Sequence, residues 1–202
     1  MTRLVTTPLT IGEARAFVEA KHAHHHAPKS ALFAVGVSAC PHERCPTRDG
    51  KVDCPDNGLT LRCAVLIGRP VARKLDQLGH VAELTRCASD RTPHVASATR
   101  MAIAGGYTRI ISYTLLGESG ASYLAAGWHV TGITNNEHGW QTRPGRDREA
   151  RQGGAKVRWE YGPNALPCDS DEAVEAAIVC ALSVGEVEIP ERTESLPLLR
   201  TL

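Results

Sequence analysis

Residues 116–128, LGESGASYLAAGW, decide the fold that the sequence predicts. They follow TRIISYTLL at 108–116, a near-continuous apolar run typical of a strand in the middle of a sheet. The segment is rich in small residues, is weakly amphipathic, and ends in glycine followed by an aromatic residue. A helix lying tightly against a sheet, or one flanking a cofactor cleft, has this composition. We therefore expect a helix packed on the central strand.

Outward from this segment, periodicity and turn signals predict a mixed α/β (α+β) sheet with helices packed on it. Thr10 and Glu13 form a capping box that begins a first helix, and Thr92-Pro93 is expected to begin another that ends at 105–106. Two antiparallel strands are joined by an enlarged, Cys-rich hairpin insert at 40–58. The expected strands are 29–39, 59–72, 80–90, 108–116, 129–134 and 156–161.

Length and composition favour one domain, at 1–161, followed by a C-terminal helical extension at 162–202 whose helix is capped by Asp169. This extension is expected to dock on the domain or to form a homodimer. The net charge is only +1, so nothing global indicates nucleic acid. No run of about 18 apolar residues indicates a membrane span, and the first residues lack a signal-peptide layout. We expect a cytoplasmic protein of a bacterium or phage-infected cell, in which seven cysteines favour metal binding over disulfides.

SYLAAGW at 122–128 resembles the fourth-helix segment of the GNAT (Gcn5-related N-acetyltransferase) superfamily, where a tyrosine is followed by three residues and then by Gly-aromatic. With GRPVARKL, ISYTL, ESGAS and KVRWE, it resembles a GNAT-like family of phages and mobile elements. That family is distantly similar to the phage Mom proteins, which alter adenine in DNA. The resemblance covers about residues 9–161 and implies a GNAT-like fold whose sheet splays beside its fourth strand.

The resemblance also implies a coenzyme A site, in which the amides that open the helix after the fourth strand bind the pyrophosphate through Arg/Gln-x-x-Gly-x-Gly/Ala. Free N–H groups and the helix dipole attract anions there. In RTPHVA at 91–96, Arg91 and Ala96 fit the two ends of this pattern. His94 replaces the central glycine, and Pro93 removes an amide donor. An acetyl-CoA or other acyl-type donor is thus expected only if these departures are tolerated. The candidate cofactor residues are Arg91, Thr92, His94, Val95, Ala96 and Ser97.

Acyl transfer to an amine needs a base for the amine proton and an acid for the thiolate leaving group. By resemblance, Tyr123 is in the position of the acid and Glu83 in that of the base. The alternative is structural: Tyr123 packs in the core with its hydroxyl satisfied, and Glu83 pairs with Arg86.

KHAHHHAP at 21–28 places histidines directly after the first helix, where the superfamily lines its acceptor site. If the helix continues, His22 and His26 lie at i and i+4 on one face, suited to a metal or to substrate. A surface cluster in a turn is the alternative. We expect His22, His25 and His26 to face substrate.

CPHERCPTRDGKVDC at 40–54 brings three cysteines and a histidine into one short loop, and tetrahedral zinc takes four such ligands. We expect one structural zinc, with unligated thiols as the alternative. The fourth ligand is left open between the histidine and a cysteine in the next strand. The candidates are Cys40, His42, Cys45, Cys54 and Cys63.

A basic loop, WQTRPGRDREARQGGAKVRW at 140–159, is suited to a phosphate backbone, although a solvated loop is the commoner case. Beside a transferase cleft it makes DNA an expected partner. The main functional expectation is a GNAT-fold transferase that modifies a DNA base, the exocyclic amine of adenine. The alternatives are an acetyl-CoA-dependent N-acetyltransferase for a small amine or protein, and a non-catalytic zinc-stapled DNA-binding module. The candidate DNA contacts are Arg143, Arg146, Arg148, Arg151 and Lys156.

Overall fold

The computed structural model describes residues 3–22, 26–42, 47–48, 51–52, 54, 58–77, 79–90, 94–116, 118–134 and 155–166. Its elements, in chain order, are β1 (Arg3–Leu9), α1 (Ile11–Lys21), β2 (Phe33–Cys40), β3 (Thr47–Arg48), β4 (Lys51–Val52), β5 (Thr60–Gly68), the 3-10 turn η1 (Arg73–Leu75), β6 (Val81–Ser89), α2 (Val95–Ala104), β7 (Arg109–Leu115), α3 (Ala121–Ala125), β8 (His129–Thr134) and β9 (Lys156–Tyr161).

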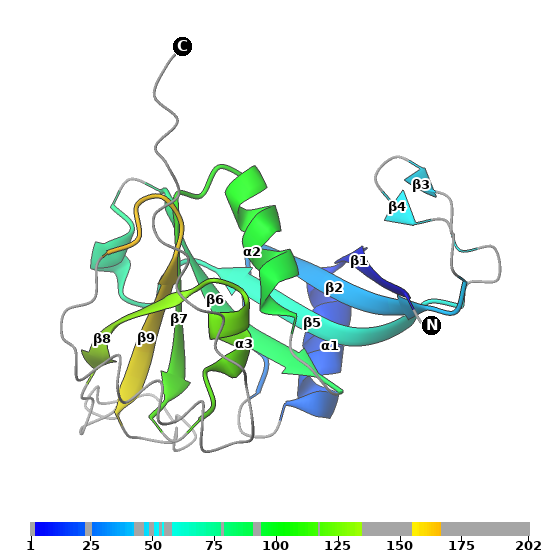
Figure 1. The fold of residues 1–202 in the computed structure, drawn as a ribbon, viewed down its shortest axis with the longest axis horizontal. Coiled ribbons are helices and arrows are strands. Elements are labelled where there is room, and N and C mark those ends of the chain that lie inside the picture. Colours follow the sequence, from blue (N-terminus) through cyan, green and yellow to red (C-terminus); the bar gives the residue numbers. More distant parts are fainter. Residues whose placement is uncertain are drawn as a thin grey trace, which may run out of the picture.

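Seven strands form one sheet in the order β1-β2-β5-β6-β7-β9-β8, and β3 and β4 form a separate small hairpin (Figure 1). Every neighbouring pair in the large sheet is antiparallel except β6 and β7, which are parallel and connected through α2. The predicted mixed sheet with helices packed on it is confirmed. The antiparallel pairing of β2 with β5 also confirms the expected hairpin around the Cys-rich insert.

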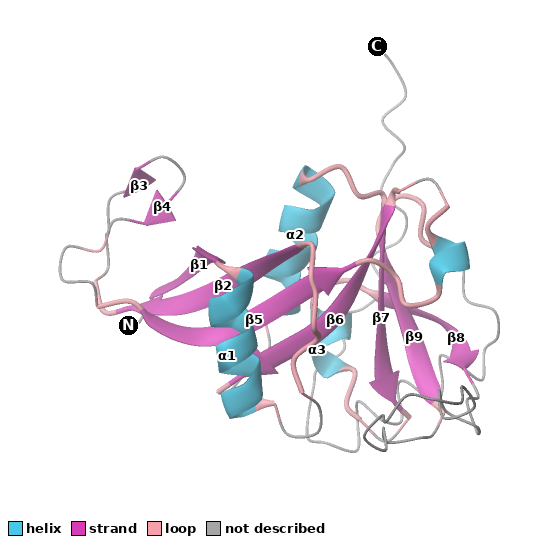
Figure 2. Cartoon of the chain, turned by 180° about the vertical axis from the view of Figure 1, so that it is seen from behind, coloured by secondary structure: helices cyan, strands magenta, loops and turns pink. Residues whose placement is uncertain are grey.

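Helices cover both faces of the sheet, with α1 on one side and α2 on the other (Figures 1 and 2). The core beneath α1 contains Ala14, Val18 and Leu66, whereas the core beneath α2 contains Val65 and Ala98. Successive residues of β5 therefore point into different cores. This two-sided burial explains why the sequence of β5 is apolar almost without interruption.

The segment that predicted the fold is shaped by two glycines. A Cβ at Gly120 would collide with the indole of Trp159, so the chain approaches this ring closely only without a side chain. Gly127 has a φ of 80°, and Trp128 N–H donates to the Tyr123 carbonyl at 3.0 Å across the end of α3. This is a left-handed glycine stop, which explains the Gly-aromatic ending.

Several element boundaries differ from those expected. The helix predicted within 116–128 is only the five residues of α3. Helix α2 begins at Val95 with His94 as its N-cap, so the expected start at Thr92-Pro93 is wrong. Strand β1 was missed, because only Val5 among its seven residues is buried and an edge strand of this kind shows little apolar alternation.

The sheet opens between its two parallel strands. Val81–Glu83 of β6 pair with Arg109–Ile111 of β7, and the paired register ends there although both strands continue. Beyond that point β6 stays with β5 and β7 stays with β9. Among the described residues no helix has the length and apolarity needed to cross a membrane.

Candidate active site

A cleft of about 600 Å³ lies where β6 and β7 separate. Its walls come from both strands, from α3, and from the start of α2. Glu83 and Tyr123, the two residues expected to act as base and acid, both line it. The splay therefore creates an open site at the end of the paired register, and the site contains side chains able to exchange protons.

Glu83 is the last residue of β6 that pairs with β7, and its side chain is buried. Burial raises the pKa of this carboxyl, while a hydrogen bond from the Val71 amide at 2.7 Å and the charge of Arg86 oppose the rise. Arg86 itself donates to the carbonyls of Thr85 and His26. A carboxylate with a raised pKa is a better proton acceptor for an amine than an exposed one.

Tyr123 is buried between Trp128 and Trp159, with ring centroids at 5.2 and 5.4 Å. Its hydroxyl lies 2.8 Å from Ser112 Oγ. Since Ser112 uses its own hydrogen on the Leu84 carbonyl at 2.9 Å, the phenol is the donor in this pair. Burial raises the pKa of Tyr123, so the phenol is protonated at neutral pH. The residue thus has both features that were considered for it: core packing and a position on the cleft.

The histidines do not share one helical face, as a continued helix would require. Helix α1 ends at Lys21, and His22 is in an extended conformation with ψ of 126°. His22 lines the cleft. His26 is largely exposed and lies 2.8 Å from Glu19, whose other oxygen accepts from the Ala27 amide. His25 lies outside the described residues.

The expected cofactor residues are partly described. Val95 lines the cleft at the start of α2. The His94 amide is directed at Cys63 Sγ, 3.5 Å away, and the Ser97 hydroxyl accepts from Thr6 and Arg100. Ala96 is half-buried in the first turn of α2, and Arg91 and Thr92 lie outside the described residues.

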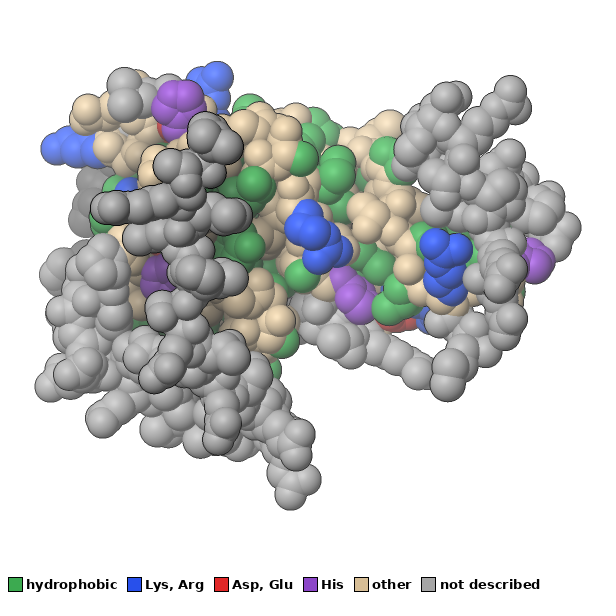
Figure 3. Space-filling model, turned by 45° about the horizontal axis from the view of Figure 1, so that its top comes forward, with side chains coloured by type: hydrophobic (Ala, Val, Ile, Leu, Met, Phe, Trp, Pro, Cys, Tyr) green, Lys and Arg blue, Asp and Glu red, His purple; other side chains and the backbone are tan. Residues whose placement is uncertain are grey.

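The strand ends that flank residues 135–154 are at the cleft. Thr134 of β8 pairs with Lys156 of β9, and both side chains line the cleft. On the face shown in Figure 3, the described Lys and Arg side chains lie apart and form no continuous patch. The remaining candidate DNA contacts lie outside the described residues: Arg143, Arg146, Arg148 and Arg151.

The cleft residues that were not predicted from the sequence include Ser112, Glu118 and Cys87. Ser112 interrupts the apolar run of β7, but a single small polar residue in a strand is a weak signal. Cys87 lies in the mixed polar and apolar sequence of β6, where nothing distinguishes it. Glu118 accepts a hydrogen bond from the Leu115 amide at 2.7 Å. Its position depends on the turn before α3, which the sequence did not reveal.

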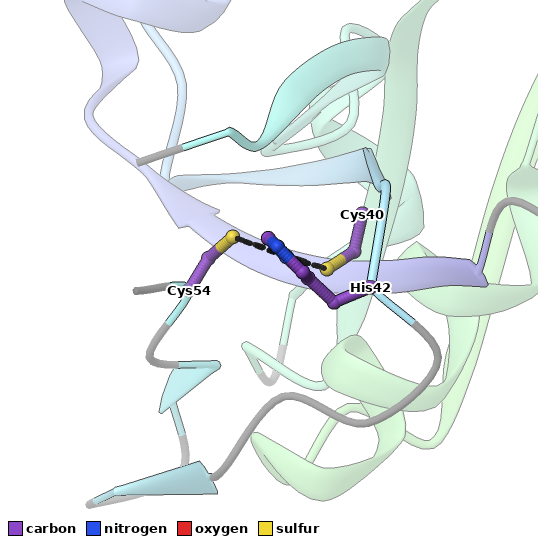
Figure 4. A group of neighbouring side chains, drawn as sticks. All are labelled: Cys40, His42 and Cys54. Atoms are coloured by element: carbon purple, nitrogen blue, oxygen red, sulfur yellow. Dashed lines mark hydrogen bonds between the residues drawn. The ribbon is translucent and has the colours of Figure 1, made fainter. Parts of the chain in front are cut away.

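A second group of candidate site residues lies at the far end of β2, away from the cleft. Cys40, His42 and Cys54 point toward one another (Figure 4), and their ligand atoms all lie within 4.8 Å of one another. The Cys40 and Cys54 sulfurs are 4.0 Å apart, and His42 Nδ1 is 3.9 and 3.5 Å from them. Ligands on a tetrahedral zinc are spaced by about 3.8 Å (S to S) and about 3.6 Å (S to N). The donor set and its spacing fit a metal ion.

Cys63, expected as a competing fourth ligand, is not part of this group in the structure. Its sulfur lies 3.8 Å from that of Cys87, inside the core beneath α2. Cys63 pairs with Val37 of β2, and Val37 lies three residues before Cys40. This register keeps Cys63 apart from the group at the end of β2. Cys45 lies outside the described residues.

No protein-family model matches the chain, and no curated protein matches it in sequence. Solved acetyltransferase structures are similar to it at low identity. A Bacillus subtilis acetyltransferase in complex with CoA is 12% identical, with a TM-score of 0.43 over 80% of this chain and 99% of that one. The Drosophila melanogaster polyamine N-acetyltransferase is 9% identical, with a TM-score of 0.42 over 79% and 100%. The Escherichia coli ribosomal-protein-S18-alanine N-acetyltransferase is 12% identical, with a TM-score of 0.38 over 81% and 99%.

Proposed function

We propose that the protein is an acyl-CoA-dependent N-acyltransferase that acts on a primary amine bound between β6 and β7. One observation carries the proposal: Glu83 and Tyr123, from different elements, line a single cleft at the splay of the sheet. The resemblance of SYLAAGW to the GNAT superfamily supports the same assignment.

The roles of the residues follow from their surroundings. A bound acyl-CoA supplies a thioester carbon that an amine can attack. Glu83, with its pKa raised by burial, accepts the proton that the amine loses. Tyr123 keeps its proton at neutral pH and turns it from Ser112 toward the cleft to protonate the departing sulfur. Backbone amides in the first turn of α2, at Ala96 and Ser97, would hold the pyrophosphate with Arg91 and Thr92.

Acetyl-CoA binding and amine-dependent release of CoA test the proposal. CoA should be followed by chromatography rather than by a thiol reagent, because the chain has seven cysteines. We expect saturable binding, and turnover with at least one class of primary amine. Glu83→Gln should retain binding and lose about 10²- to 10⁴-fold in kcat. The control is Glu118→Gln, which alters another cleft carboxylate that accepts one backbone amide. Absence of acetyl-CoA binding at millimolar concentration would overturn the proposal.

A DNA base is the second candidate acceptor, in line with the distant similarity to phage Mom proteins. It is favoured by the attachment of the loop 135–154, which carries the arginines, at Thr134 and Lys156 on the cleft. We expect replacement of Arg146, Arg148 and Arg151 by alanine to weaken DNA binding and flatten its salt dependence. The same three changes to lysine are the control, because they keep the charge. Equal DNA binding by the alanine variant and the wild type would exclude this acceptor.

We also propose that Cys40, His42 and Cys54 bind one structural zinc ion, with Cys45 as the fourth ligand. Support comes from the spacing of the three ligand atoms and from the burial of both described thiols. Cys45 lies three residues after His42 in the same insert. A closed four-ligand site would fasten the insert to the end of β2 and would perform no chemistry.

A further inference from the structure

Two cysteines that neither the cleft chemistry nor the zinc group uses lie together on neighbouring strands. Cys87 of β6 is opposite Val65 of β5, and Cys63 lies two residues away on β5, so both side chains are on the same face of the sheet. The two sulfurs are 3.8 Å apart. Cys87 lines the cleft, whereas Cys63 is fully buried behind it.

The start of α2 lies directly at this pair. The His94 amide, at the N-cap of a ten-residue helix, is 3.5 Å from Cys63 Sγ. An amide and a helix N-terminus both favour a thiolate. The Cys87 thiol acts in the same direction: its hydrogen bond lowers the pKa of Cys63. The buried sulfur is thus prepared to carry negative charge. The same hydrogen bond and burial raise the pKa of the Cys87 thiol, whose sulfur is the one on the cleft that a reagent can reach.

We propose that Cys87 and Cys63 form a redox-active dithiol in the cleft, which a low-molecular-weight disulfide converts into a Cys63–Cys87 disulfide. Cys87 attacks one sulfur of the reagent RSSR, forming a mixed disulfide and releasing the first RSH. The Cys63 thiolate then attacks the Cys87 sulfur and releases the second RSH. The two thiol protons leave on the two RSH molecules, so the protein loses two hydrogens and RSSR is reduced.

Closure needs a movement of the strands as well as of the side chains, because Cys63 and Cys87 are diagonal rather than opposite neighbours. A disulfide needs its sulfurs about 2.0 Å apart, so the gap must shrink by slightly less than 2 Å. Diagonal neighbours on adjacent strands usually have their Cα atoms about 7–8 Å apart, whereas a disulfide usually joins Cα atoms about 4.4–6.8 Å apart. We therefore expect closure to draw β5 and β6, which are paired along Glu83–Ser89, toward each other at this point. The disulfide would weaken the hydrogen bond from the His94 amide, because a disulfide sulfur carries no negative charge, and would change the floor of the cleft beside Val95.

Oxidised glutathione and trypsin test the proposal on the full-length, zinc-loaded chain. Cys63 begins the tryptic peptide CAVLIGRPVAR and Cys87 begins CASDR, so the expected disulfide joins two identifiable peptides. Intact mass should show the loss of two hydrogens without a retained glutathione. In Cys63→Ser, the second step is blocked, and one glutathione should stay on CASDR. In Cys87→Ser, neither the linked peptides nor an adduct on CAVLIGRPVAR should form.

The zinc group provides an internal control, since its two cysteine sulfurs are nearly as close, at 4.0 Å. Cys40 and Cys54 lie on the separate peptides SALFAVGVSACPHER and VDCPDNGLTLR, which should stay unlinked. The proposal is overturned if glutathione does not accumulate on Cys87 in Cys63→Ser, or if oxidation links Cys87 to any cysteine other than Cys63. These readouts are masses of peptides and do not depend on acyl transfer.

Discussion

The Tyr123 phenol donates a hydrogen bond to Ser112 Oγ, and the Ser112 hydroxyl donates one to the Leu84 carbonyl. This chain connects α3 to β7 and then to β6, just beyond the last paired residue of the two strands. Ser112 therefore bridges the base of the splay and determines where the proton of Tyr123 points. The general acid of the proposed reaction is positioned by a side chain that had no assigned role in the sequence.

Two substitutions separate the chemical role of Tyr123 from its packing. We expect Tyr123→Phe to keep both ring contacts and the Ser112–Leu84 bond, and therefore to lose about 1 kcal/mol of stability or less. Its kcat should fall by about 10²- to 10⁴-fold if the phenol is the acid. Ser112→Ala leaves a buried phenol without its acceptor and should cost about 1–3 kcal/mol. Urea denaturation and steady-state kinetics check both. Unchanged kcat in Tyr123→Phe would show that Tyr123 only packs.

Glu83 should make folding stability depend on pH in a predictable direction. Its pKa is raised in the folded protein, so the folded state binds its proton more tightly than the unfolded state. The stabilisation is complete below the pKa of an unfolded glutamate, about 4.3, and is lost as pH rises through the folded pKa. We expect Glu83→Gln, which still accepts from the Val71 amide, to be the more stable protein at neutral pH.

The stability difference between the two proteins should shrink as the pH falls toward about 4. Thermal unfolding of both proteins across the pH range measures it, with Glu118→Gln as the matched control. A stability difference that grows at low pH would contradict the raised pKa.

Metal content tests the group at the end of β2. Protein purified without added zinc should contain about one equivalent, and Cys40→Ser or Cys54→Ser should abolish high-affinity binding. Cys63→Ser should retain the zinc, because Cys63 lies against Cys87 instead. Cys45→Ser decides the fourth ligand. Chelation should loosen the insert while Trp128 and Trp159, buried in the main core, keep their fluorescence. Clearly substoichiometric zinc in reduced wild-type protein would contradict the assignment.

Gly120 should tolerate no side chain. A Cβ at this position meets the Trp159 indole, which is itself held by a hydrogen bond to Thr114 Oγ1 at 2.9 Å. We expect Gly120→Ala to destabilise the protein by about 1–3 kcal/mol through overpacking. Gly12→Ala, near the start of α1, is a control with the same chemical change, because a Cβ there makes only an ordinary contact with Thr10 Oγ1 at 3.9 Å. Chemical denaturation measures both, and equal effects would show that the contact with Trp159 is unimportant.

Local patterns in the sequence were sufficient to predict most elements and the class of the sheet. The apolar runs of β2, β5 and β7 and the Thr10–Glu13 capping box are properties of contiguous residues, and each is present in the structure. The Gly-aromatic ending at 127–128 likewise predicted a helix stop, because a left-handed residue there favours glycine. Edge strand β1 was not predictable in this way, since it buries only Val5.

Only the tertiary structure decided which side chains meet. The position of β9 between β7 and β8 brings Trp159 against Gly120 and Tyr123, although Trp159 follows both residues by more than 30 positions. The end of α1 at Lys21 separates His22, on the cleft, from His26, beside Glu19. Strand register places Cys63 next to Cys87 and not in the zinc group. The physical reason is that local patterns specify the conformation of contiguous residues, whereas strand order and register depend on packing across the whole sheet.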